Sequence, residues 1–100
     1  MATTTKALVR AAAGTSTATL YTVPASTTTV VTNIVVTNSA ASAATFTLTL
    51  DGVDILTTTA IAANSTAMFD LKQVMATTKI IAGFASATTV KFHISGVEIA

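Results

Sequence analysis

The sequence predicts an all-β protein: a single-domain antiparallel β-sandwich of seven to eight strands with an extended N-terminal arm. Residues that favour strands (Val, Ile, Thr, Phe and Tyr) far outnumber Glu, Lys, Gln and Arg, which favour helices. Several segments alternate apolar and polar residues with a period of two. Turn residues separate these segments at the spacing typical of sandwiches and barrels, roughly 8–12 residues. Strand order is not readable, so jelly-roll and immunoglobulin-like topologies both remain open.

The chain's 100 residues suffice for one domain. We assign residues 1–17 to an N-terminal arm or edge strand and residues 18–100 to the β-sandwich. Within the first part, Thr3 to Ala12 is weakly strand-like. Ala18 to Val23 is predicted as a short strand that stops at Pro24, because proline has no backbone N–H to donate to a neighbouring strand.

A longer strand is expected from Thr28 to Thr37. Its apolar residues form two faces, with Val30, Ile34 and Val36 on one and Val31 and Val35 on the other. A strand that is apolar on both faces lies in the middle of a sheet or carries an interface.

The clearest local signal is a hairpin. Thr45 to Leu50 alternates strictly between threonine and apolar residues, and Val53 to Leu56 resumes the apolar pattern. Asp51 and Gly52 stand between them, and Asp-Gly favours a two-residue turn in which both central residues have positive φ. The sequence therefore predicts a tight antiparallel hairpin here.

The second half predicts three further strands, at Thr66 to Val74, Lys79 to Ala85 and Thr89 to Ile99. The last of these contains Gly96, where we expect a β-bulge. One extra residue there would reverse the alternation, so that Val97 and Ile99 point inward.

Composition excludes several classes of function. The nine charged residues give a net charge of +1, and the five basic ones are scattered, so a nucleic-acid partner is not expected. The absence of cysteine rules out disulfides and thiolate chemistry. No stretch of consecutive apolar residues approaches the length of about 20 residues that a membrane-spanning helix needs. The N-terminal stretch lacks the apolar centre of a signal peptide, so we expect synthesis in the cytoplasm and no membrane partner.

Candidate chemical residues are few. His93 alternates away from the core with Ser95 on the same face, but a catalytic triad needs a nucleophile and an orienting acid together. Asp51 and Asp54 flank the predicted turn, and two carboxylates fall short of the six to eight oxygens of a typical Ca²⁺ site. We therefore predict no enzyme, no metal, no cofactor and no small-molecule ligand.

The polar faces suggest assembly. Thr45, Thr47 and Thr49 form an uncharged row, whereas soluble monomers usually protect their sheets with lysine and other charges. Such a surface suits contacts between copies or within a lattice. A plain threonine-rich β-surface without a partner is the alternative.

Four segments resemble small all-β structural proteins of tailed bacteriophages. They are Leu20 to Ala25 (LYTVPA), Val30 to Asn38 (VVTNIVVTN), Phe46 to Gly52 and Gly96 to Ile99, and the resemblance spans about residues 18 to 99. It implies a β-sandwich and a non-enzymatic role as a virion component. It carries over no catalytic residue, and the arm lies outside it.

The expected function is a capsid decoration (cement) protein, bound in many copies to the exterior of the virion. Its expected partners are the major capsid protein and itself, as a homotrimer. The alternative is a receptor- or glycan-binding module on a tail or fibre, and an enzyme is the third reading. The arm, over residues 2–12, would cross to a neighbouring subunit. The residues expected at interfaces are Lys6 and Arg10 as polar anchors, Leu8 and Val9 as apolar anchors, and Val31 and Val35 on the long strand.

Overall fold

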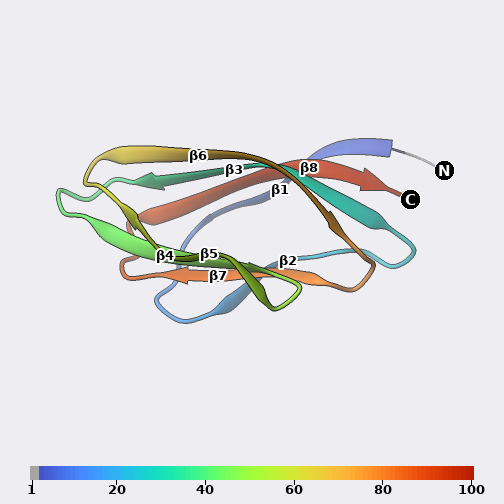
Figure 1. Cartoon of the computed structure of the whole chain (residues 1–100), viewed down its shortest axis with the longest axis horizontal. Helices are drawn as coiled ribbons and strands as arrows, with labels where there is room; N and C mark the ends of the chain where they lie inside the picture. Colours follow the sequence, from blue (N-terminus) through green and yellow to red (C-terminus); the bar gives the residue numbers. More distant parts are fainter. Residues whose placement is uncertain (1–2) are drawn as a thin grey trace.

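A computed structural model describes residues 3–100, which form two antiparallel sheets of four strands (Figure 1). The all-β class and the antiparallel pairing expected from the sequence are confirmed. The strands are β1 (Thr3–Ala12), β2 (Ala18–Thr22), β3 (Thr28–Asn38), β4 (Ala44–Leu50), β5 (Val53–Ile61), β6 (Ser65–Met75), β7 (Ile80–Ala85) and β8 (Val90–Ile99).

The pairing follows one simple scheme. The chain folds back on itself at the β4–β5 turn, so that β4 pairs with β5, β3 with β6, β2 with β7 and β1 with β8. Two further pairings, β3 with β8 and β4 with β7, join these ribbons. The result is a first sheet in the order β1-β8-β3-β6 and a second sheet in the order β2-β7-β4-β5, which form the two layers of Figure 1.

One core lies between the two sheets. Phe46 of the second sheet meets Phe69 and Phe92 of the first, with ring centroids 6.4 and 6.0 Å apart and edge-on geometry. Such aromatic pairs stabilise beyond the area that they bury. Around them pack buried aliphatic residues from both sheets, among them Ile34, Val36, Leu48, Ile81, Val90 and Ile94.

The predicted hairpin is confirmed as β4 and β5. Asp51 has a φ of 57° and Gly52 a φ of 76°, so both central residues occupy the left-handed region that this turn requires. The Lys79 ammonium lies 3.6 Å from the Asp51 carboxylate and links the turn to the start of β7.

Of the two alternatives for the N-terminal segment, the structure has the edge strand, because residues 3–12 form β1 at the margin of the first sheet. The extended arm is wrong over these residues, and residues 1–2 lie outside the described residues. The residues of β1 pair with β8 from Thr3 to Ala12. Leu8 is an extra residue in this ladder, and the bulge lets both Leu8 and Val9 face the core, where they are 8% and 4% exposed. The strand is part of the domain rather than a link to a neighbour.

The central position of β3 is confirmed, but its predicted faces are wrong at one end. Thr32 is an extra residue in the pairing with β8, and the alternation therefore changes between Val31 and Asn33. Val31 is fully buried together with Ile34, whereas Val30 is only partly buried on the opposite face.

The bulge expected at Gly96 lies instead in the two strands beside it. β8 keeps its alternation from end to end, so Val97 and Ile99 face outward and Glu98 faces inward, opposite to the prediction. Gly96 is needed for another reason. A Cβ atom there would overlap the Val30 carbonyl oxygen and come within 3.0 Å of the Leu8 side chain.

Candidate interaction surface

The outward side of the first sheet, called the outer face below, presents residues from all four strands. The strand registers place Arg10 of β1 opposite His93 of β8, His93 opposite Val35 of β3, and Val35 opposite Met68 of β6. Directly opposed residues in antiparallel strands share one face. These four side chains therefore form one row across the sheet.

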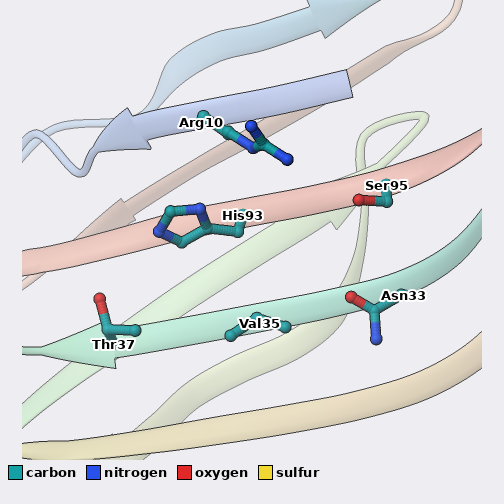
Figure 2. A pocket seen from close by; sticks show the side chains of 6 residues that line it. All are labelled: Arg10, Asn33, Val35, Thr37, His93 and Ser95. Carbon is teal, nitrogen blue, oxygen red and sulfur yellow. The ribbon is translucent and has the colours of Figure 1, made fainter. Parts of the chain in front are cut away.

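A second row runs parallel to the first and completes a shallow hollow. Ser95 lies opposite Asn33, and Asn33 lies opposite Asp70. The hollow has a volume of about 450 Å³, and Figure 2 shows its lining side chains on three adjacent strands. They are Arg10, Asn33, Val35, Thr37, His93 and Ser95.

Apolar side chains on this face are unusually exposed. Met68 is 74% exposed and Val74 is 72% exposed, and both belong to the edge strand β6. Val74 lies opposite Val30, which lies opposite Val97. A row of valines therefore crosses three strands beyond the hollow. Contiguous apolar surface of this kind marks a protein interaction site more often than isolated apolar residues do.

The outer face carries four charged residues, Arg10, Asp70, Lys72 and Lys91, and the Lys91 ammonium donates a hydrogen bond to the Ser39 hydroxyl at 3.3 Å. Among residues 3–100 the ion pairs are Lys6 with Glu98 and Lys79 with Asp51, so neither Arg10 nor Asp70 takes part in one. Arg10 lies on β1 and Asp70 on β6, at opposite margins of the sheet. Three strand spacings separate them, roughly 14 Å, so they do not neutralise each other.

A polar cluster closes one end of the molecule between the sheets. The Tyr21 hydroxyl of β2 donates a hydrogen bond to the Glu98 carboxylate of β8 and contacts the Thr29 hydroxyl at 2.9 Å. The Lys6 ammonium lies 3.4 Å from the same carboxylate. Burial, and then the hydrogen bond to Glu98, raise the pKa of Tyr21. The hydrogen bond from Tyr21 lowers the pKa of Glu98. The cluster is accordingly a neutral phenol bound to an ionised carboxylate.

The residues predicted at interfaces divide into two groups. Arg10 and Val35 line the hollow, and Lys6 lies at the surface in its ion pair. The other three, Leu8, Val9 and Val31, pack in the core and offer no surface to a partner. The two bulges account for this difference, since each turns inward a residue that simple alternation places outside.

The candidate chemical residues lie in two separate places, His93 and Ser95 on the outer face and Asp51 and Asp54 at the β4–β5 turn. His93 and Ser95 share the outer face as predicted, but the hollow around them has no acidic residue in its lining. Asp51 pairs with Lys79, and Asp54 accepts a hydrogen bond from Thr57 at 3.1 Å. Within residues 3–100, no group of three or more His, Cys, Asp or Glu side chains is placed to hold a metal ion.

The sequence analysis did not single out two of the six residues that line the hollow, nor two of their neighbours. Asn33 and Thr37 stand two residues to either side of Val35, and they share its face by alternation. The period-two alternation of a strand therefore predicts both residues from the position of Val35. Met68 and Asp70 join the same surface only through the β3–β6 register, which the sequence does not reveal.

The second sheet presents one aromatic side chain outside the core. Phe84 of β7 is half-buried, lies opposite Thr47 of β4, and alternates with the buried Ile81 and Ala85. It therefore stands on the outward side of the second sheet, beside the predicted threonine row.

Comparisons with protein-family models, with curated proteins and with solved structures find no match to this chain. The described part of the chain also contains no helix long and apolar enough to cross a membrane.

Proposed function

We propose that this protein is a non-enzymatic virion structural protein, a decoration protein that binds the capsid exterior in many copies and stabilises it. The observation that carries the proposal is the outer face, which exposes the apolar side chains of Met68 and Val74. Its proposed partners are the major capsid protein and further copies of this chain. The phage-like segments of the sequence agree with this role.

We further infer a jelly-roll topology. A jelly roll has eight strands in two sheets and contains two Greek keys. The ribbon folded at the β4–β5 turn supports this assignment, because each strand of the first half pairs with its counterpart in the second. An immunoglobulin-like sandwich instead places its first two strands side by side in one sheet. Jelly rolls occur in viral capsid and lectin domains, so the topology is compatible with the proposed role.

Decoration explains why a small domain of low charge would carry such a surface. A protein that binds only the assembled shell stabilises that state by mass action. Contacts that are weak individually become effective when one subunit touches several neighbours of a repeating lattice. The outer face provides a broad area for such contacts without requiring a deep pocket.

The test is the copy number of this protein in purified virions, quantified against the major capsid protein. Near-stoichiometric amounts support decoration, and loss of the protein should lower the temperature at which the shells open. A few copies per particle would place it on the tail or a fibre. Absence from the virion would refute the proposal.

A glycan- or receptor-binding module on a tail or fibre is the second candidate, and Phe84 is the observation that favours it. An aromatic ring suits the apolar face of a sugar ring, and Phe84 is only partly buried on the outward side of the second sheet. Binding on a glycan array that is lost in Phe84→Ala would support this candidate, and an array without signal would refute it.

A further inference from the structure

We propose that the outer face of the first sheet binds the same face of a second copy of this chain. The two copies would be related by a two-fold axis that runs parallel to the strands, between β8 and β3. Such an axis places β1 of each copy over β6 of the other, because β1 and β6 are the two margins of the sheet. A copy paired in this way cannot use the outer face against a shell, so the pairing describes the protein free in solution and is tested there, separately from the virion role.

Charge complementarity supports a second copy as the occupant. The β1 margin carries Arg10 and the β6 margin carries Asp70, and neither is in an ion pair within the described residues. The two-fold axis brings each arginine to the β6 margin of the other copy, one row of residues from Asp70, and forms the pair twice. The rows of Arg10 and Asp70 are two residues apart along the strands, roughly 7 Å, a distance that an extended arginine side chain spans.

Lys72 also projects from β6, two residues beyond Asp70. It is exposed, and no ion pair joins it to Asp70 in residues 3–100. Asp70 is therefore free to accept the guanidinium of a second copy. Lys72 remains at the edge, where water solvates it.

The shapes of the two margins are complementary as well. Met68 projects from the β6 margin with 74% of its surface exposed, and the hollow opens between β1, β8 and β3. The same axis carries Met68 of one copy to the β1 side of the hollow in the other, next to Arg10 and His93. Methionine is flexible and fills irregular apolar gaps readily. Each copy thus inserts its Met68 into the hollow of the other copy and receives the other Met68 in its own hollow.

The area of the face is adequate for a specific dimer. Four strands at about 4.8 Å spacing and about 35 Å long present a plane of roughly 650 Å² before side-chain relief is counted. Specific interfaces bury about 800 Å² per partner. The valine row at Val74, Val30 and Val97 extends the apolar contact beyond the hollow. A two-fold pair differs from the trimer expected from the sequence, so mass alone separates the two.

The experiment measures the mass of the purified protein by sedimentation equilibrium across a wide concentration range. We expect a species of twice the 10.1 kDa chain mass at high concentration. Arg10→Glu or Asp70→Lys should each raise the dimer dissociation constant at least about tenfold, because like charges then face each other. The combined Arg10→Glu/Asp70→Lys variant should restore dimerisation.

A matched control is Asp54→Lys, which reverses an exposed acid on β5 of the second sheet. This variant should dimerise like the unaltered protein. Circular dichroism and denaturant unfolding should show that every variant is folded. A strict monomer, a trimer, or a dimer that the combined variant fails to restore would each overturn the proposal.

Discussion

Replacing Gly96 by alanine tests how closely β8 and its two neighbours pack at the bulges. The new Cβ atom would overlap the carbonyl oxygen of Val30 and lie 3.0 Å from Cδ1 of Leu8. The leucine side chain has some freedom to move. The carbonyl belongs to the backbone of β3, which is held between β8 and β6, so relief requires a shift of a central strand.

The expected cost follows from that rigidity. Adding a methyl group to a well-packed interior typically costs about 1–3 kcal/mol. We expect the upper end, about 3 kcal/mol, because the obstacle is backbone rather than the end of a side chain. A loss of this size is a large fraction of the roughly 5–15 kcal/mol by which a domain is stable. It corresponds to a fall in Tm of about 12–24 °C for a domain of this size.

Chemical denaturation followed by circular dichroism measures the effect, with Gly14→Ala as the control. The nearest atom to a Cβ at Gly14 is the Ser16 carbonyl oxygen at 3.7 Å, an ordinary contact, and this variant should unfold close to the unaltered protein. Equal stability of the Gly96→Ala and Gly14→Ala variants would refute the close approach of β8 to β3.

Three other predictions follow from single residues. Asn38→Ala should destabilise by about 2–4 kcal/mol in urea unfolding, because this buried side chain makes four hydrogen bonds, to Ser42, Ala62, Ala40 and Thr89, and each contributes about 1 kcal/mol. Gly52→Ala should cost about 1–2 kcal/mol, since alanine is strained at a φ of 76°, and an unchanged midpoint would contradict the turn geometry. Tyr21→Phe should cost about 1–3 kcal/mol at neutral pH through the lost hydrogen bond to the Glu98 carboxylate. Because that bond lowers the pKa of Glu98 below 4.5, its contribution is full above pH 4.5 and disappears as pH falls through the lowered value. The two proteins should therefore converge in stability in acid, and a difference that persists there would refute the role of the carboxylate.

The sequence predicted the structure correctly where single residues determine the local backbone conformation. Asp51 and Gly52 specify the turn by their tolerance of positive φ, and the structure confirms the hairpin. Alternation likewise placed His93 on the outside of its strand. These predictions succeed because they depend on neighbours in sequence and not on which strand lies alongside.

The errors arose where neighbouring strands decide the outcome. A bulge belongs to a pair of strands, so no property of Gly96 alone shows that the extra residues are Leu8 and Thr32. Gly96 lets the neighbouring strands come close to β8 because it has no side chain. The extra residue of each bulge belongs to the neighbouring strand, Leu8 in β1 and Thr32 in β3. The expected arm failed for the same reason, since weak strand propensity in residues 3–12 is overcome by pairing with β8.

The same bulges explain how so apolar a sequence divides between core and surface. By drawing Leu8 and Val31 inward, they fill the core with residues that strict alternation would expose. The bulge at Thr32 also leaves Val30 on the outer face, where it lies beside the exposed Val74 and beside Val97, which faces outward because β8 keeps its alternation. A soluble monomer would be expected to place charges there, as protection against association. The chain instead places this apolar row on the same face as Arg10 and Asp70, which lie at opposite margins and take part in no ion pair within residues 3–100. This combination favours one defined orientation of a second copy over indiscriminate aggregation, because only the two-fold arrangement matches both charges at once.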